Sequence, residues 1–307
     1  MTRLGFLSVL TTFVAVAAPA QVVRAEPVAQ EYLGLDVGGN LELAPGKSLA
    51  ADGAVLIVHG SAAHHRMETI VALQGNLKTR GINSLAITLS LGLQKRSGMF
   101  DCKLEHDHRH ADASDEIIAW VEWLQKKGAS RVYLLGHSRG GAQAALAVVE
   151  RADIGVRSLI AAAPLYQTDA AINARYTSGF GTPLLPLLTK ARRLVEAGEG
   201  DTLMEVPGFL HCKPAKVTAA AFHDYYAPDP QHDVLKLLGE ITIPSLTIVA
   251  GADEVVPALA GAVAEAKSSQ RLPESAAVAT IEGADHFFRD LFGDELADRV
   301  AEFVRRR

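Results

Sequence analysis

The sequence predicts an α/β fold in which helices flank a mostly parallel central sheet. Continuous apolar runs, such as residues 54–58 and 132–135, have the length and composition of strands that are buried on both faces. Segments with helical periodicity separate these runs along most of the chain, which is typical of a sheet built from parallel strands. One stretch, residues 165–238, has few strand-like runs and breaks this alternation. A structureless loop of that length would be unusual, so we expect a helical cap inserted above the sheet.

The first half of the chain begins the alternation. The expected elements are strands at 32–36 and 40–43 on either side of a turn at Gly38 and Gly39, a buried strand at 54–58, a helix at 67–80 and a strand at 82–89. Gly81 is expected to end the helix, because glycine readily adopts the conformation that follows a helical C-terminus. A polar loop rich in histidine follows the last of these strands.

The second half continues the same pattern around the insertion. The expected elements are a helix that ends at Lys127, strands at 132–135 and 156–162, a helix directly after Ser138, a strand at 246–249, a helix at 257–267, a strand at 276–281 and a helix at 287–305. Asp112 or Ser114 is expected to cap the helix that ends at Lys127, because short polar side chains accept hydrogen bonds from free N–H groups at helix starts.

The N-terminal segment is typical of a secretory signal peptide. Arg3 precedes an apolar run over residues 4–20, and small residues follow, with Val23-Arg24-Ala25 and Ala18-Pro19-Ala20 as candidate cleavage sites. We therefore expect residues 1–25 to be a signal peptide, residues 26–307 to form the mature domain, and the protein to be periplasmic or secreted. No membrane insertion is expected after the signal is removed. The alternative is an uncleaved anchor or a first core helix.

Charge and cysteine content restrict the partners and the compartment. The net charge is −5 and the only basic run is the last three residues, so nothing indicates a nucleic-acid partner. The chain has two cysteines, Cys102 and Cys212. An even number in an exported protein makes them a candidate disulfide, and two free thiols are the alternative.

The main catalytic motif lies at the end of the apolar run 132–135. Gly136-His137-Ser138-Arg139-Gly140 follows this run, and an alanine-rich helical segment begins straight after it. A strand, Gly-x-Ser-x-Gly and a helix form a nucleophile elbow, in which a tight turn exposes the serine hydroxyl at the edge of the sheet. The sequence therefore predicts Ser138 as a nucleophile. A chance occurrence of the motif is the alternative.

A serine hydroxyl needs a base, and the base needs an orienting acid. Asp253 follows the strand at 246–249, and His286 follows the strand at 276–281. Because parallel strands end at the same edge of the sheet, we expect both side chains to meet Ser138 there. The alternatives are that Asp253 is a helix cap, with Glu254 or Asp285 as the acid, and that His286 is a packing or surface histidine.

These motifs resemble the α/β-hydrolase superfamily, in particular its serine aminopeptidases, monoglyceride lipases and small esterases. The chain order serine, acid, histidine matches that family over nearly all of the mature chain. The resemblance implies an oxyanion hole made by the backbone N–H groups of Ser61, after His59-Gly60, and of Arg139. Where the family often has another glycine, this chain has Ala62. The implied reaction is two-step acyl transfer without a metal or organic cofactor.

Other functions remain open from the sequence. The segment His106-Asp107-His108-Arg109-His110-Ala111-Asp112 is rich in potential ligands and allows a metal-dependent hydrolase. A solvated loop or a cap-docking surface is the alternative for this segment. The same fold also supports perhydrolases and non-catalytic binding proteins. His64 and His65, beside the oxyanion turn, are expected to line the pocket.

The substrate is the least determined feature. An ester is favoured over an amide, because esters have the better leaving group, so we expect a carboxylesterase or lipase rather than a peptidase, with a small-molecule ester as the partner. The insertion contains several aromatic residues that either line a substrate pocket or form the core of the cap, namely Tyr166, Tyr176, Phe180, Phe209, Phe222, Tyr225 and Tyr226. Most of them are expected in the core. The sequence does not indicate the oligomeric state.

Overall fold

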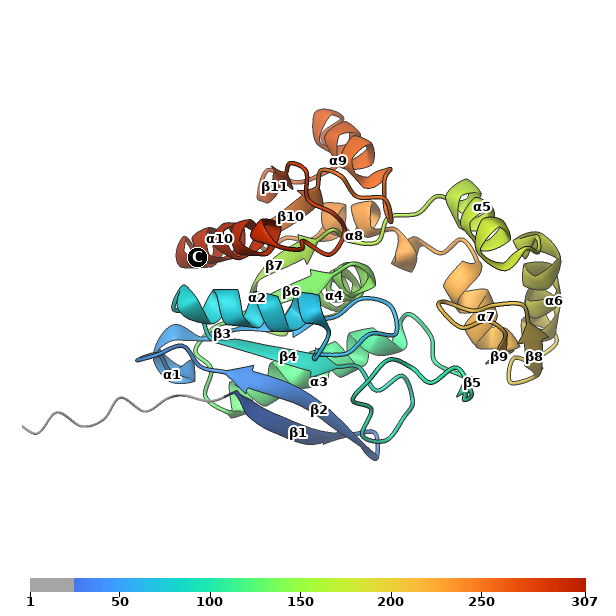
Figure 1. Ribbon diagram of the computed structural model, residues 1–307, viewed down its shortest axis with the longest axis horizontal. Coiled ribbons are helices and arrows are strands. Elements are labelled where there is room, and N and C mark those ends of the chain that lie inside the picture. The colour runs from blue at the N-terminus through green and yellow to red at the C-terminus, as the bar shows by residue number, and fades with distance from the viewer. Residues whose placement is uncertain (1–24) are drawn as a thin grey trace, which may run out of the picture.

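The structure, a computed structural model, describes residues 25–307 and consists of a large central sheet with flanking helices (Figure 1). The strands of the central sheet are β1 (Glu26–Tyr32), β2 (Leu35–Glu42), β3 (Ala54–Val58), β4 (Ser84–Thr88), β6 (Val132–His137), β7 (Val156–Ala162), β10 (Ser245–Ala250) and β11 (Ala276–Ile281). The helices are α1 (Leu49–Asp52), α2 (Glu68–Thr79), α3 (Asp112–Lys126), α4 (Arg139–Glu150), α5 (Asp169–Phe180), α6 (Leu184–Glu196), α7 (Ala219–Tyr226), α8 (Val234–Glu240), α9 (Leu259–Ser268) and α10 (Leu291–Arg305), with a short 3₁₀ helix η1 (Pro230–His232).

Within these described residues the sheet has eight strands in the order β1-β2-β4-β3-β6-β7-β10-β11. β1 and β2 are antiparallel to their neighbours, and the strands from β4 to β11 are parallel. The predicted α/β fold with a mostly parallel sheet is therefore confirmed. β6 lies near the middle, so the residue that follows it emerges at the centre of the sheet edge.

Strand β3 is apolar at every position because both faces of the sheet are covered there. Along β3, Leu56 and Val58 face the core formed with α3, α4 and α8, whereas Val55 and Ile57 face the core formed with α2 and α10. These four side chains are fully buried. Alternate side chains of a strand point to opposite faces, so a strand covered on both faces is mainly apolar along its whole length.

The N-terminal strands differ from the prediction. β1 and β2 form a hairpin whose turn lies at Leu33 and Gly34, and Gly38 and Gly39 lie within β2. A Cβ atom on Gly39 would lie 2.7 Å from the carbonyl oxygen of Ala86 in β4. The prediction of a turn at Gly38 and Gly39 was wrong, because these glycines permit a close approach of two strands.

The start of α3 also differs. The helix begins at Asp112, but neither Asp112 nor Ser114 caps its first turn. The Asp112 carboxylate instead accepts a hydrogen bond from the N–H of Arg109 at 2.6 Å, and the Ser114 hydroxyl donates to Glu150 on α4. Both side chains are therefore used in contacts that the local sequence does not reveal.

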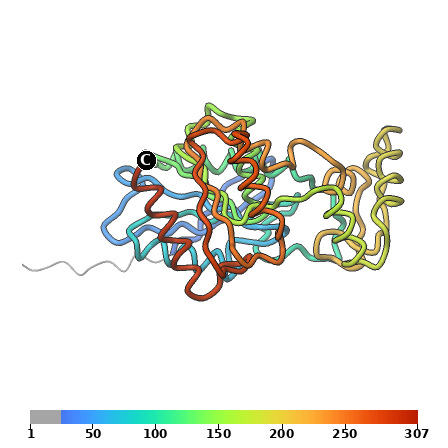
Figure 2. Tube along the Cα trace, turned by 90° about the horizontal axis from the view of Figure 1, so that it is seen from above, coloured from blue at the N-terminus to red at the C-terminus, as the bar shows by residue number. Residues whose placement is uncertain are grey.

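The insertion forms a cap at one end of the molecule, separate from the central sheet (Figures 1 and 2). It contains α5, α6 and α7, and also the short strands β8 (Leu203–Val206) and β9 (Ala215–Thr218), which the sequence prediction missed. β5 (Glu105–His106), from the histidine-rich loop of the main body, pairs with β9 and completes a three-stranded sheet in the order β5-β9-β8. The main body thus contributes a strand to the cap.

The cap has its own apolar core, and its end differs from the expected position. Tyr176, Phe209 and Phe222 are buried at the centre of this core. The side chains of α8, although inside the expected range 165–238, pack in the main core beside α4. The cap therefore ends before α8, because that helix covers the central sheet.

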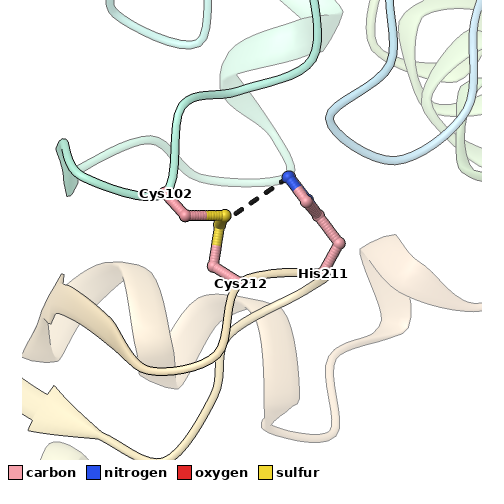
Figure 3. A group of neighbouring side chains, drawn as sticks. All are labelled: Cys102, His211 and Cys212. Carbon is pink, nitrogen blue, oxygen red and sulfur yellow. Dashed lines mark hydrogen bonds between the residues drawn. A yellow bond between two sulfur atoms is a disulfide. The ribbon is translucent and has the colours of Figure 1, made fainter.

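A disulfide joins the cap to the main body. Cys102, in the loop after β4, is bonded to Cys212, which is buried in the cap between β8 and β9 (Figure 3). His211 lies beside them, with its Nε2 3.7 Å from Sγ of Cys212. These three residues bring potential ligand atoms within 4.8 Å of one another. Sulfur ligands for metals are thiolates, so the disulfide form shown does not supply them.

The expected signal peptide, residues 1–25, lies outside the described residues apart from Ala25. From residue 25 onward, none of the helices has the length and apolar composition needed to cross a membrane.

We predict that loss of the disulfide destabilises the fold. The bond closes a loop with a sequence separation of 110 residues. Reduction, or the Cys102→Ser/Cys212→Ser double variant, should lower the free energy of unfolding by about 2–5 kcal/mol. Urea unfolding of oxidised and reduced wild type measures this loss without changing the buried Cys212 side chain. Equal unfolding midpoints for the two forms would show that the bond contributes nothing.

Candidate active site

Ser138 occupies a strained turn between β6 and α4. Its backbone has φ 56° and ψ −126°, a region that residues with a side chain rarely adopt. The Ser138 N–H donates to the carbonyl of Ala162 at 2.9 Å, and its carbonyl accepts from the N–H groups of Gly141 and Leu165, both at 2.9 Å. These three hydrogen bonds hold Ser138 in its strained conformation, and such support is needed for a strained residue to persist.

The two motif glycines allow the backbones to approach at this turn. A Cβ on Gly136 would lie 2.1 Å from the carbonyl oxygen of Gly140, and a Cβ on Gly140 would lie 2.3 Å from the carbonyl oxygen of His59. Real Cβ atoms do not come so close to backbone atoms. The contact between Gly140 and His59 also holds the loop after β3 against the start of α4, so the elbow and the loop at Ser61 share one packing contact.

The structure brings Ser138, His286 and Asp253 together at the carboxyl edge of the sheet. The Ser138 hydroxyl donates to His286 Nε2 at 2.9 Å, and His286 Nδ1 donates to the Asp253 carboxylate at 2.7 Å. All three side chains are buried. This arrangement has the geometry of a nucleophile, a base and an orienting acid.

Asp253 is held as a carboxylate. Burial by itself raises the pKa of Asp253, but the hydrogen bonds from His286 and from the N–H groups of Val256 and Val255 outweigh it and lower the pKa overall. Because the pKa is depressed in the folded state, this contribution to stability is present above the ordinary aspartate pKa and is lost as the pH falls through the folded value.

The two alternative acids lie elsewhere. Asp285 forms an ion pair with Arg289 at 2.9 Å and accepts hydrogen bonds from the N–H groups of Phe287 and Arg289. Glu254 is exposed. Asp253 alone of these three contacts the imidazole of His286. The second carboxylate oxygen of Asp253 accepts hydrogen bonds from the N–H groups of Val255 and Val256, both at 2.8 Å. Asp253 therefore contacts His286 and also makes the cap-like contacts of the alternative interpretation.

The residues expected to form the oxyanion hole lie on either side of Ser138. Arg139 is the first residue of α4 and Ser61 lies in the loop after β3. Within residues 25–307 neither backbone N–H has a hydrogen-bond partner. Ala62 adopts φ 52°, so it takes the left-handed conformation for which the family often has glycine. Two free N–H groups beside a serine hydroxyl are what a developing oxyanion requires.

Two further buried residues, whose roles the sequence analysis missed, hold these loops. His59 donates from Nδ1 to the Gly60 carbonyl at 2.8 Å and accepts the Leu89 N–H on Nε2 at 3.0 Å. Arg96 donates to the carbonyl of Ala62 at 3.2 Å. Burial lowers the pKa of His59 to about 3, so its imidazole is neutral and can accept as well as donate.

His137 supports the histidine side of the site. Its Nε2 donates to the carbonyl of His286 at 2.8 Å, which fixes the loop that follows β11. Burial, with the nearby His286, lowers the pKa of His137 to about 4. The only sequence signal for His59 and His137 was their position next to the motif residues, and Arg96 had none.

A cavity of about 250 Å³ opens beside Ser138 and His286. Ser61 lines it, and its remaining wall is largely apolar, with Ala63, Met67, Ile70, Met99, Val255 and Phe287. His64 and His65, expected in this wall, are absent from it. His65 instead contacts the Thr88 hydroxyl through its backbone N–H at 3.0 Å and through Nδ1 at 2.6 Å. The cavity suits a small apolar group.

The histidines of the segment 106–112 form a buried chain of contacts. His106 Nδ1 lies 3.2 Å from His108 Nε2, and His108 Nδ1 lies 2.9 Å from the Tyr225 hydroxyl. In the described part of the chain, the group that brings three potential metal ligands together is the one at Cys102, not these histidines. The segment docks the cap on the main body, which is one of the two interpretations that the sequence allowed.

Most of the cap aromatics are core residues. Four are buried in the cap core and two pack against it, namely Tyr176, Phe209, Phe222 and Tyr225, and Phe180 and Tyr226. Tyr166 packs against the main core instead. Tyr166 and Tyr225 also line a second cavity between cap and body.

Comparisons with known proteins bear on the family and the fold. A model of the alpha/beta hydrolase family matches residues 55–303. Est1E from Butyrivibrio proteoclasticus, in a structure with ferulic acid bound, matches with a TM-score of 0.64 and 21% identity over 91% of this chain and 98% of that one. A soluble variant of monoglyceride lipase from Saccharomyces cerevisiae, in complex with a substrate analogue, has a TM-score of 0.62 and 14% identity over 94% of this chain and 97% of its own.

A monoacylglycerol lipase from Paleococcus ferrophilus also matches, with a TM-score of 0.59 and 18% identity over 87% of this chain and 98% of that one. At these identities the structures show a shared fold. No curated protein matches the chain.

We predict that Gly140→Ala disrupts the site and Gly261→Ala does not. Both glycines lie in helices, but the new Cβ at position 140 meets backbone carbonyls, whereas the Cβ at 261 meets open space. Gly140→Ala should destabilise by about 1–3 kcal/mol, and Gly261→Ala should stabilise by about 0.5–1 kcal/mol. Thermal unfolding of the two variants checks this. Equal stability of Gly140→Ala and wild type would contradict the close backbone contact.

Proposed function

This chain belongs to the α/β hydrolase family, and we propose that it acts within that family as a serine hydrolase of small carboxylic esters. The observation that carries the proposal is the connected chain from Asp253 through His286 to Ser138, with hydrogen bonds of 2.7 and 2.9 Å. Two free backbone N–H groups lie beside it, on Ser61 and Arg139. Together these supply every group that acyl transfer to serine requires.

The proposed reaction has two steps. Ser138 attacks the carbonyl carbon of the ester while His286 takes the hydroxyl proton, and the Ser61 and Arg139 N–H groups hold the resulting oxyanion. His286 then protonates the leaving alcohol, which departs and leaves an acyl-Ser138. Water, deprotonated by His286, hydrolyses this intermediate and restores the serine. Asp253, ionised throughout, orients the imidazole and stabilises its charged form.

An ester is the proposed substrate for two reasons. The cavity at Ser138 is small and mainly apolar, which suits an acyl or alkyl group rather than a polypeptide segment. The proteins of similar structure include Est1E, solved with ferulic acid bound, a monoacylglycerol lipase and a monoglyceride lipase. These support ester hydrolysis over cleavage of peptides.

We also propose that the protein is exported. The N-terminal sequence has the charge and apolar pattern of a signal peptide. The disulfide between Cys102 and Cys212 supports this location, because such bonds persist mainly in oxidising compartments.

We predict that a fluorophosphonate probe labels Ser138. The hydroxyl is activated by His286, so the probe should attach at one site, and Ser138→Ala should abolish labelling. Ser268→Ala is the matched control, because that serine lies on the exposed surface of α9 and contacts only the carbonyl of Glu265. Intact mass spectrometry before and after labelling measures the adduct. Absence of labelling, or labelling that survives in Ser138→Ala, would refute the proposal.

We further predict that p-nitrophenyl esters are hydrolysed faster than aminoacyl anilides. Across esters of increasing acyl length, kcat/KM should rise by about fourfold for each methylene that enters the apolar cavity, because burial of a methylene contributes about 0.8 kcal/mol. The increase should stop once the cavity is full. Steady-state kinetics with both series measures this. Faster cleavage of the anilides would contradict an ester substrate.

A further inference from the structure

Arg139 is a buried cation without an anionic partner. Its side chain directly follows the nucleophile in sequence, and the residue is only 8% exposed. It forms no ion pair with a carboxylate among residues 25–307. Burying an unpaired charge destabilises a fold, so buried cations are normally paired. Burial lowers the pKa of Arg139, which reflects the same cost to its charged form.

The guanidinium is held in place, but only some of its N–H groups are hydrogen-bonded. Its Nε donates to the Ser61 hydroxyl at 2.9 Å, and its Nη1 donates to His110 Nδ1 at 3.2 Å. The ring of Tyr225 lies below it, 4.9 Å from the guanidinium carbon. Within the described residues Nη2 has no hydrogen-bond partner, and the protein does not enclose this atom completely. Both N–H groups of Nη2 therefore remain available to a ligand.

Arg139 lines a second cavity, of about 490 Å³, between the cap and the main body. Arg139, His110 and Tyr225 line it on the inner side, and Tyr166 and His232 complete the wall. The partner of Arg139 Nε, Ser61, lines the smaller cavity at Ser138. The contact between Arg139 and Ser61 thus joins the walls of the two cavities. Ser138 lines the smaller cavity, and Arg139, the next residue in sequence, lines the larger one.

The groups around Arg139 do not neutralise its charge. Burial lowers the pKa of His232 to about 4 and the pKa of His110 well below its usual value, so both are neutral. Burial also raises the pKa of Tyr225, which keeps the phenol protonated. Burial raises the pKa of Asp224 to about 6, so this carboxylate is charged at neutral pH and attracts Arg139 through space. It accepts a hydrogen bond from the N–H of His110, however, and forms no ion pair with Arg139 among the described residues.

The mouth of the cavity restricts the charge of the ligand. Asp169, Asp229 and Asp233 are exposed there, together with Lys236. Exposed charges are screened by water and salt, so they weaken but do not cancel attraction by the buried guanidinium. One free guanidinium nitrogen and an acidic mouth favour a singly charged group over a dianionic phosphate.

We propose that Arg139 binds a carboxylate carried by the substrate, so that the substrate is an ester with a free acid group. This inference rests on the proposed ester hydrolysis at Ser138 and adds a charge requirement to it. The carboxylate accepts hydrogen bonds from Nη2 and supplies the negative charge that the buried cation lacks. The acid group belongs either to the acyl part, as in a half-ester of a dicarboxylic acid, or to the leaving group.

The test compares acid and methyl-ester forms of the same substrate. One pair is mono-p-nitrophenyl glutarate and its methyl ester, and the other is 4-butyryloxybenzoate and its methyl ester. In one of the two pairs, the wild type should prefer the acid by about tenfold or more in kcat/KM, the size expected for a charge-assisted hydrogen bond. Arg139→Gln should abolish this preference, and Arg139→Lys should retain part of it.

The preference is a ratio within one enzyme, so a general loss of activity in the Arg139 variants does not affect it. Arg192→Gln, on the exposed face of α6, removes the same charge from the cap and should leave the ratio unchanged. Equal rates for acid and methyl ester in both pairs, or a preference that persists in Arg139→Gln, would overturn the inference.

Labelling separates this inference from the proposed function. If the fluorophosphonate does not label Ser138, the proposed function fails. If it labels Ser138 but all four esters are inert, protection from labelling is measured with 4-hydroxybenzoate and with its methyl ester. Stronger protection by the acid, lost in Arg139→Gln, supports the site, and equal protection by both compounds overturns it.

Discussion

The close backbone packing around Ser138 is the constraint on which the rest of the site depends. Because Gly136 and Gly140 lack side chains, β6 can turn directly into α4 and the carbonyl of His59 can lie against the helix start. This contact places the loop that carries Ser61 beside the serine. His137, between the two glycines in the motif, holds the loop of His286. One five-residue turn therefore positions the proposed nucleophile, both proposed oxyanion donors and the proposed base.

Burial decides the protonation of the groups that support this turn. His59 and His137 are neutral because burial lowers the pKa of each to about 3 and about 4, respectively. A neutral imidazole has one donor and one acceptor, which lets His59 join the Gly60 carbonyl to the Leu89 N–H. Asp253 is the opposite case, since its hydrogen bonds outweigh burial and keep it ionised. The supporting groups are thus neutral while the orienting acid is charged.

The parts of the fold that could be predicted are those with strong local patterns. Apolar runs such as β3 and residues 132–135 of β6 reveal a sheet covered on both faces. The order of Ser138, Asp253 and His286 after successive strands places them at one edge. β8 and β9 were missed because strands of four residues carry little periodicity. Long-range contacts had no local signal either. The contact of Arg139 with Ser61 joins residues 78 apart in sequence. The position of the Arg139 side chain beside two cavities therefore could not be predicted from its neighbours in the chain.

The attachment of the cap has a consequence for how substrates enter. An insertion joined to its domain only by its two chain ends can swing as a lid on a hinge. Here the disulfide at Cys102 adds a third anchor, and the pairing of β5 with β9 adds a fourth, both on the same loop of the main body. Anchors away from the hinge line block such a rotation. The same loop supplies Met99 to the wall of the cavity at Ser138, so the width of that entrance depends on how the disulfide and the pairing with β9 hold the loop.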